Sequence, residues 1–248
     1  MIHFMKMAFA AEVARPVAGQ VSCAACGLGQ LCRAETQDGG SDTSSVHQRR
    51  LQPGERLFEA GTPQSALYAV HAGFLKTCRP LQAGTSQVVG LHIMGDVLGL
   101  DGISSRVHAT DAVALTSGEV CVIALVHADR LMERDHTSGA RLRALLSEHV
   151  ARAGDQFVTL GSLSAQQRVA AFLLDMSDRW AARGYSATIF DLCMTRKDIG
   201  SYLGLTFETV SRMLSDFRDL RWLRVDGRRV ELLDRAAIER TLGTIPRR

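Results

Sequence analysis

The sequence of 248 residues contains no apolar run approaching the roughly 18 residues that a membrane-spanning helix needs. Residues 1–14 carry one lysine inside an apolar patch, and they lack the charged start and unbroken apolar core of a secretory signal. We therefore expect a cytoplasmic protein with no membrane partner. No Ser/His/Asp grouping, phosphate-binding loop or paired-carboxylate motif stands out, so an enzyme is the weakest of the function classes.

The composition is that of a globular protein, with 46% hydrophobic and 22% charged residues, and the length suffices for two domains with separate cores. The net charge of +3 is small but unevenly distributed. Residues 163–248 carry 15 Lys and Arg against 11 Asp and Glu, whereas residues 1–162 carry 14 against 15. A basic C-terminal third favours a nucleic-acid-binding module, although a solvated, mildly basic surface would have the same composition.

The chain is predicted to have an N-terminal segment over residues 1–45, followed by a β domain over residues 46–134. In the β domain short apolar runs, typical of strands, are separated by glycine turns. Short strands at close spacing indicate a compact all-β barrel or jelly roll. The runs lie at residues 56–58, 67–70, 74–77, 87–93 and 119–125.

Residues 135–162 are predicted to form one long helix, because apolar residues recur there every three or four positions. The stripe lasts roughly three heptads and lies between two domains, which favours a symmetric two-helix dimer seam. The alternative is a helix that packs on its own β domain. The seam residues are Leu142, Leu146, Val150, Ala153, Phe157 and Leu160.

Residues 163–248 are predicted to form a winged helix-turn-helix domain. A helix start resembling a capping box stands at Thr195, Gly204 ends that helix, and Thr206 caps the next one. Helix, glycine turn, helix and hairpin together are typical of this DNA-binding arrangement. Two strand candidates joined by an Asp-Gly turn signal supply the hairpin, at residues 222–225 and 229–232.

The start of the second helix is predicted to enter the major groove, although a plain amphipathic helix with a solvated polar face is the alternative. Arginine can bond guanine O6 and N7 together, glutamate can accept from cytosine N4, and serine can bond a base edge or a phosphate. Arg196 and Lys197 stand where phosphate contacts are expected, but a solvated pair fits as well. The candidates for base reading are Glu208, Thr209, Ser211 and Arg212.

Three cysteines, Cys23, Cys26 and Cys32, lie within ten residues in a glycine-containing stretch. Cytosolic cysteines so closely spaced are usually metal ligands or redox groups rather than disulfides. Iron–sulfur clusters and zinc typically take four sulfur ligands, and the fourth would come from Cys78, Cys121 or Cys193. The residues alone leave zinc, an iron–sulfur cluster and no metal as alternatives.

Over residues 21–233 the sequence resembles the CRP/FNR regulators, and within them the oxygen-responsive FNR class. The most specific likeness is the stretch 195–212, where Glu208, Ser211 and Arg212 match the family's Glu-x-x-Ser-Arg reading motif. The Cys-x2-Cys-x5-Cys run also matches, and Cys121 stands where FNR-type proteins carry their fourth ligand.

The resemblance implies an oxygen-labile [4Fe–4S] cluster held by Cys23, Cys26, Cys32 and Cys121. It implies an α+β fold with a β-roll sensor domain of the cyclic-nucleotide-binding type, a long dimerisation helix and a winged helix-turn-helix. It also implies a homodimer on double-stranded DNA with TTGAT-type half-sites, RNA polymerase as a further partner, and control of genes for low-oxygen growth. The alternative is a regulator of the same family with a structural zinc site and a small-molecule signal in the β-roll.

The sequence departs from the family pattern at two places. In residues 98–109, apolar residues and Asp101 replace the glutamate of the Gly-Glu step with which cyclic-nucleotide-binding members grip phosphate, so cyclic AMP is not expected as a ligand. In the dimer stripe Ala153 stands where FNR proteins carry an acid, so we expect some dimer to persist after cluster loss. Cys78 and Cys193 match no family role, and Cys193 is expected in the core.

Overall fold

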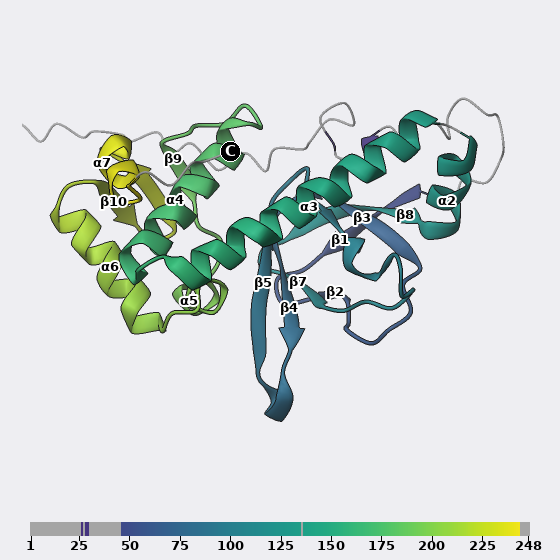
Figure 1. The fold of residues 1–248 in the computed structure, drawn as a ribbon, viewed down its shortest axis with the longest axis horizontal. Helices are drawn as coiled ribbons and strands as arrows, with labels where there is room; N and C mark the ends of the chain where they lie inside the picture. The colour runs from purple at the N-terminus through teal and green to yellow at the C-terminus, as the bar shows by residue number, and fades with distance from the viewer. Residues whose placement is uncertain (1–25, 27, 30–45, 135, 244–248) are drawn as a thin grey trace, which may run out of the picture.

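The computed structural model of the chain describes residues 26, 28–29, 46–134 and 136–243. The fold mixes helix and sheet, as predicted, with a β domain at one end and a smaller domain at the other (Figure 1). The long helix α3 (His136–Ser162) runs along the β domain and leads into the smaller one. None of the helices in the described ranges is long and apolar enough to cross a membrane.

The β domain is a sandwich of two antiparallel sheets with strand orders β1-β8-β3-β6 and β2-β7-β4-β5. Apolar side chains of both sheets meet in one core, among them Leu51, Val70, Leu75 and Val120. Each predicted run overlaps a strand, whereas β1, β6 and β7 were not predicted. The strands are β1 (Val46–Leu51), β2 (Arg56–Phe58), β3 (Ala66–Ala72), β4 (Leu75–Pro80), β5 (Ser86–His92), β6 (Val97–Leu98), β7 (Asp111–Ala114) and β8 (Gly118–Ala124).

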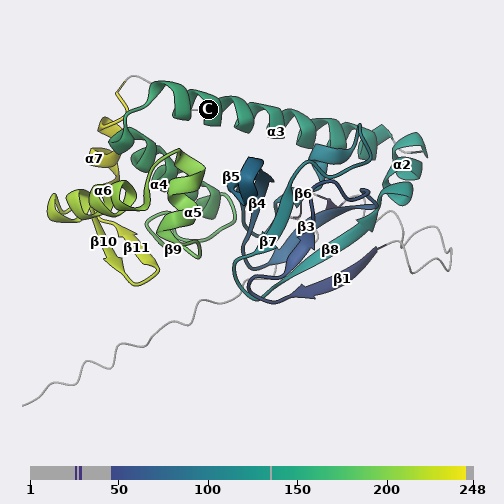
Figure 2. The ribbon, with the colours of Figure 1, turned by 90° about the horizontal axis from the view of Figure 1, so that it is seen from below.

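Helix α2 (Leu125–Arg134) follows β8 directly and turns the chain into α3. The first half of α3 packs on the sandwich, because Leu142 and Leu145 are buried in a cluster with Leu67 and Ile123 of the sheet. Figure 2 shows α3 lying across the β domain from α2 to the smaller domain. The β domain and α3 are thus joined through an apolar contact as well as through the chain.

The smaller domain contains the predicted helix-turn-helix and hairpin, with a third strand added. Strand β9 pairs with β11, which pairs with β10 in the hairpin, so the sheet order is β10-β11-β9. The sequence pattern did not predict β9. The elements are α4 (Ala165–Ala181), β9 (Ile189–Asp191), α5 (Arg196–Leu203), α6 (Phe207–Asp219), β10 (Leu223–Asp226), β11 (Arg229–Leu232) and α7 (Arg235–Arg240).

The two domains share a continuous apolar core, which the sequence did not predict. Phe74, Val88, Leu91 and Met94 of the β domain belong to the same buried cluster as the interior of α4, α5 and α6. The rings of Phe74 and Trp180 pack with their centroids 5.6 Å apart. The smaller domain is therefore docked on the β4–β5 side of the sandwich.

Candidate DNA-binding interface, cysteine site and cavity

Helix α5 begins at a capping box, as predicted. The Thr195 hydroxyl accepts a hydrogen bond from the Asp198 N–H at 3.1 Å, and the Asp198 carboxylate accepts one from the Thr195 N–H at 3.0 Å. Two of the N–H groups left without a partner at the helix start are thereby satisfied. The pKa of Asp198 is lowered, because hydrogen bonds from Lys76 and Thr195 outweigh the opposing effect of burial, so this carboxylate stays ionised.

The turn between α5 and α6 depends on two glycines. Gly204 ends α5 with φ 62° and ψ 38°, a left-handed conformation that favours glycine. Gly200 lies against the turn, and a Cβ there would approach the carbonyl oxygen of Leu205 to 2.7 Å. Thr206 then caps α6 by accepting from the Thr209 N–H at 3.2 Å. The position of α6 is therefore tightly fixed by that of α5.

Helix α6 buries Val210, Leu214 and Phe217 and presents its polar face outward. Of the predicted reading residues, Glu208 and Arg212 are exposed, while Thr209 and Ser211 are half-buried. Hydrogen bonds to its own N–H and to the Thr206 hydroxyl lower the pKa of Glu208, which keeps an ionised acceptor at the helix start. These four residues lie within the first two turns of α6, as a reading helix requires.

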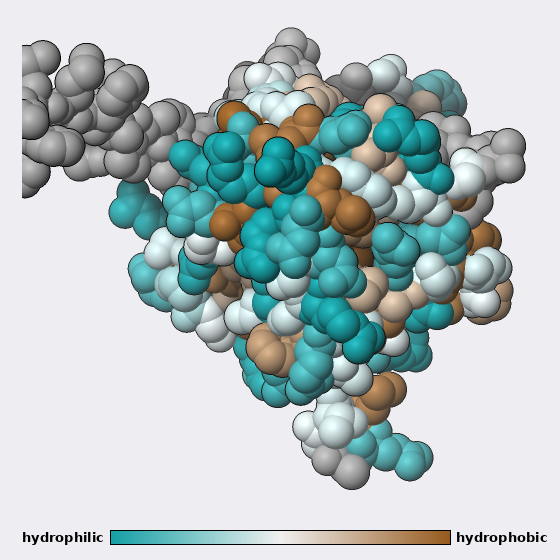
Figure 3. All heavy atoms as spheres, turned by 90° about the vertical axis from the view of Figure 1, so that its left-hand side faces the viewer, coloured by the Kyte–Doolittle hydropathy of each residue, from teal (hydrophilic) through white to brown (hydrophobic). Residues whose placement is uncertain are grey.

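The predicted phosphate contacts lie at the start of α5. Lys197 is exposed and Arg196 is half-buried, and burial lowers the pKa of the Arg196 guanidinium. The hairpin that follows α6 turns at Gly227, with φ 59°, and Arg228, because Asp226 pairs with Arg229. Seen from this end of the molecule, hydrophilic residues cover most of the surface, with hydrophobic ones scattered between them (Figure 3).

Two of the four predicted cluster ligands lie within the described residues. Cys26 and Cys121 are both half-buried and both pack against the buried cluster that contains Leu28, Leu67 and Ile123. Cys26 also packs against the core shared by the two domains. Cys23 and Cys32 lie outside the described residues. Among the described ones, no group of three or more His, Cys, Asp or Glu is arranged to hold a metal ion.

The other two cysteines lie in surroundings that disfavour a thiolate. Cys78 is buried in β4, and burial raises the pKa of its thiol. Burial also raises the pKa of the Cys193 thiol to about 11. Because the thiolate is the form that binds metals, both are poor ligands in these positions. Cys193 packs against the shared core, in line with the expectation that it belongs to the core.

The predicted dimer stripe on α3 divides into two parts. Leu142 is buried in the core of its own β domain and Leu146 packs against that core, so this part of α3 is a helix packed on its own domain, the alternative to a dimer seam. Farther along, Val150 is 69% and Phe157 is 80% exposed, which is unusual for large apolar side chains. Ala153 between them is exposed too, and Leu160 is half-buried.

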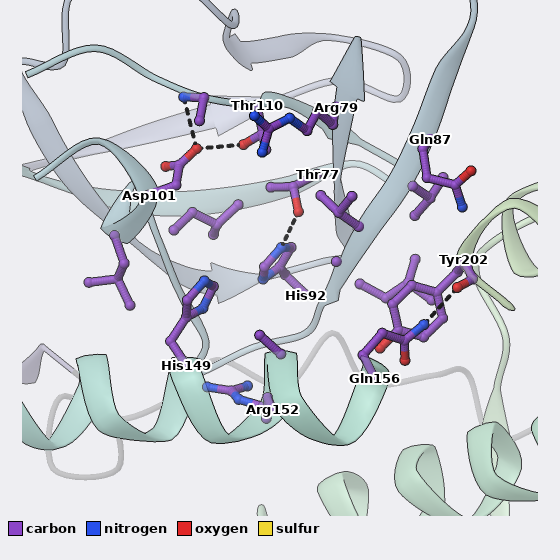
Figure 4. A pocket seen from close by; sticks show the side chains of 18 of the residues that line it. Thr77, Arg79, Gln87, His92, Asp101, Thr110, His149, Arg152, Gln156 and Tyr202 are labelled. Atoms are coloured by element: carbon purple, nitrogen blue, oxygen red, sulfur yellow. Dashed lines mark hydrogen bonds between the residues drawn. The ribbon is translucent and has the colours of Figure 1, made fainter. Parts of the chain in front are cut away.

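A cavity of about 680 Å³ lies between the sandwich and α3, and the sequence did not predict it (Figure 4). Helix α3 contributes His149, Arg152 and Gln156 to its wall, and the Gln156 amide donates to the carbonyl oxygen of Tyr202 at 2.7 Å. On the opposite side His92 forms a hydrogen bond to the Thr77 hydroxyl at 3.0 Å. Burial lowers the pKa of His92 to about 4, so its ring is neutral at neutral pH.

A carboxylate, that of Asp101, also lines the cavity. Asp101 accepts hydrogen bonds from the Ala109 N–H at 3.1 Å and from the Thr110 hydroxyl at 2.9 Å (Figure 4). Arg106 forms an ion pair with Asp129 of α2 at 2.8 Å. A bound phosphate would need hydrogen-bond donors from this segment. Those of Ala109 and Thr110 already bind Asp101, and the Arg106 guanidinium already binds Asp129.

Both domains match family models. A model described as Crp-like helix-turn-helix domain matches residues 167–241, and one described as cyclic nucleotide-binding domain matches residues 48–135. Among solved structures, FixK2 from Bradyrhizobium japonicum has a TM-score of 0.76 and 29% identity, and the match covers 81% of this chain and 99% of that one. The match therefore extends over both domains.

Two curated relatives match over nearly the whole chain. The transcriptional regulatory protein btr of Bordetella pertussis is 38% identical, over 89% of this chain and 93% of that protein. The fumarate and nitrate reduction regulatory protein of Escherichia coli is 34% identical, over 90% of this chain and 91% of that protein. Both relatives are regulators rather than enzymes. Identity at this level over both domains shows that the chain belongs to the CRP/FNR family of DNA-binding transcriptional regulators.

Proposed function

We propose that the protein is an FNR-like regulator of low-oxygen gene expression that binds TTGAT-type palindromes as a homodimer and senses oxygen through a [4Fe–4S] cluster. The ligands in this proposal are Cys23, Cys26, Cys32 and Cys121. The observation that carries it is the packing of Cys26 and Cys121, distant in sequence, against one buried cluster. In the cytoplasm the protein would act on transcription together with RNA polymerase.

The surroundings of the two described cysteines suit such a group. They are half-buried beside apolar side chains, which would limit the access of solvent to a bound cluster. A bound cluster would supply oxygen-sensitive iron chemistry, and the thiolates would hold it at the end of α3 that packs on the sandwich. A structural change on loss of the cluster would reach α3 directly, because Leu142 and Leu145 of that helix belong to the same buried apolar cluster as the packing surface of Cys26 and Cys121.

Anaerobic purification tests the cofactor. The proposal expects a brown protein with about four iron and four sulfide per chain, whose visible absorption bleaches in air. A colourless protein that contains zinc and is indifferent to air would favour the alternative of a structural zinc site. The cavity between the sandwich and α3 favours that alternative in one respect, because its size would admit a small-molecule signal.

We expect no binding of cyclic AMP in that cavity. The Asp101 carboxylate occupies the Ala109 and Thr110 donors, and a phosphate brought beside it would be repelled. Isothermal titration calorimetry with cyclic AMP at millimolar concentration is expected to show only heats of dilution. A saturable heat with one site per chain would contradict this expectation.

Arg212→Ala is expected to remove sequence discrimination at one base of the half-site. A bidentate arginine–guanine pair contributes about 1–3 kcal/mol of discrimination, and a palindrome bound by a homodimer contains two such pairs. Binding to a TTGAT-type palindrome should therefore weaken by about 2–6 kcal/mol, at least about 30-fold. Binding to a palindrome with that guanine replaced should change little. Fluorescence anisotropy at one fixed salt concentration measures both affinities.

Arg218→Ala is the matched control, because Arg218 is exposed at the far end of the same helix and pairs with Asp219. It should leave the ratio of the two affinities unchanged. An equal loss on both DNA sequences in Arg212→Ala would assign Arg212 to a phosphate instead of a base.

A further inference from the structure

One buried acid of the sensor domain, Asp96, forms ion pairs with two arginines of the DNA-binding domain. Asp96 lies in the turn between β5 and β6 and is 5% exposed. Its carboxylate accepts from Arg179 Nη2 at 2.5 Å and from Arg183 Nη2 at 2.6 Å, and it also accepts from the Ile93 N–H at 2.9 Å. Arg179 belongs to α4, and Arg183 follows the end of that helix. The contact therefore fixes the C-terminal end of α4.

The arginines also bind the backbone of the sensor domain. Arg179 donates to the carbonyl oxygen of Leu91 at 2.8 Å, and Arg183 donates to that of Met94. Although burial alone would raise the pKa of Asp96, the two guanidinium groups keep the pKa below its usual value. Arg152 of α3 adds a more distant charge at 3.8 Å. The carboxylate is consequently ionised at neutral pH, and the contact is a directional ion pair.

A second contact between the two domains lies between the β4–β5 hairpin and α5. Lys76 Nζ pairs with Asp198 Oδ1 at 2.6 Å, and this Asp198 is the residue of the capping box. The Val88 N–H donates to the Ser201 hydroxyl at 2.9 Å, and the Gln87 amide donates to the Ser201 carbonyl oxygen. Strand β5 and α5 lie side by side in Figures 1 and 2.

The two contacts together determine the orientation of the reading helix. Attachment through both α4 and α5 restrains rotation of the domain better than attachment through one helix, and the apolar core shared by the two domains adds contact area. Helix α6 follows α5 closely, because Gly200 lets the turn approach α5. A rotation of α5 would therefore move Glu208 and Arg212 with it.

We propose that Asp96 and Lys76 of the sensor domain are positioning residues that fix the distance between the two reading helices of the dimer. The proposal rests on the homodimer and palindrome of the proposed function. The spacing of the two half-sites matches the distance between the two reading helices across the two-fold axis of the dimer. A DNA-binding domain that is held rigidly against the rest of its protomer therefore selects one spacing. A domain released from these contacts would tolerate several spacings, at the cost of affinity for the preferred one.

The test is a series of duplexes with two TTGAT-type half-sites at the preferred spacing and at one or two base pairs more or less. Full-length protein, purified anaerobically, is titrated against each duplex at one salt concentration. The wild-type protein is expected to bind the duplex of one spacing at least tenfold more tightly than the duplexes of the other spacings. Arg183→Gln and Lys76→Gln should each lower affinity about tenfold at that spacing and leave the other affinities nearly unchanged.

Arg79→Gln is the control, since Arg79 is exposed on the same strand as Lys76. Arg183→Gln is preferred to Asp96→Asn because loss of the buried acid would leave two guanidinium groups without their partner and endanger folding. Variants that keep the wild-type spacing preference, or that lose affinity equally at every spacing, would overturn the inference. A wild type that binds none of the palindromes would contradict the proposed function instead.

Discussion

Cys121→Ser is expected to abolish binding of the proposed cluster and, with it, the proposed low-oxygen activity. Oxygen is a harder donor than sulfur, so a serine hydroxyl replaces a thiolate ligand poorly. Because Cys121 is half-buried in β8, paired with Gln48 of β1 and Ala69 of β3, the similar size of serine should preserve the sandwich. Iron and sulfide content, visible absorption and a DNA-binding assay on anaerobically purified protein measure the loss. Serine at Cys23, Cys26 or Cys32 should have the same effect.

Cys78→Ser and Cys193→Ser are the matched controls and should retain a full iron and sulfide load. Burial raises the pKa of both thiols, so neither readily supplies a thiolate. If Cys121→Ser kept its cluster while Cys78→Ser lost it, the fourth ligand would be Cys78.

Phe157→Asp is expected to convert the protein to a monomer and to prevent binding to the palindrome. Phe157 is 80% exposed on α3, and an uncompensated charge buried at a seam costs about 3 kcal/mol or more, at least a hundredfold in the dimer dissociation constant. Ala153→Asp should act in the same direction, most clearly in the apo form. The wild type should be mainly dimeric with its cluster, and without it should keep measurable dimer at micromolar concentration. Sedimentation velocity of both forms measures these populations.

Leu142→Ala distinguishes a residue of the protomer's own core from a residue of the dimer seam. Leu142 is 5% exposed beside Leu145, so its truncation should lower the free energy of unfolding by about 2–5 kcal/mol and leave the dimer dissociation constant nearly unchanged. Wild-type dimerisation in both Phe157→Asp and Ala153→Asp would show that this face of α3 does not form the seam.

Local patterns predicted the elements that have a strong signal of their own. The strands between glycine turns and the capped helices α5 and α6 follow from residues close in sequence. Strand β1 alternates weakly, since its sequence is Val-His-Gln-Arg-Arg-Leu, and β6 and β9 span only Val97–Leu98 and Ile189–Asp191. Elements so short or so polar are specified by the neighbours with which they pair, which a periodic pattern does not contain.

The candidate site was predictable to the extent that it is built from neighbours in sequence. The proposal of Glu208 and Arg212 as reading residues follows from a helix start, and the proposal of Cys23, Cys26 and Cys32 as ligands follows from their spacing. The proposal of Cys121 as the fourth ligand rests on the family resemblance, because nothing in the sequence alone distinguishes Cys121 from Cys78. The contact of Asp96 with Arg179 and Arg183 joins residues more than eighty positions apart, and a Gly-Asp turn does not indicate its partners.

The short connection between α3 and α4 couples the unfolding of the two domains. Leu163 and Ser164 connect the two helices, and Leu163 is itself buried in the core that the domains share. Melting of either domain would expose the apolar surface of the other, so the described parts should unfold in one cooperative transition. The reading unit is consequently a poor module for transplantation. Excised before Ala165 it would carry an uncovered apolar face around Trp180, and it would aggregate unless the recipient supplied the surface of β4 and β5.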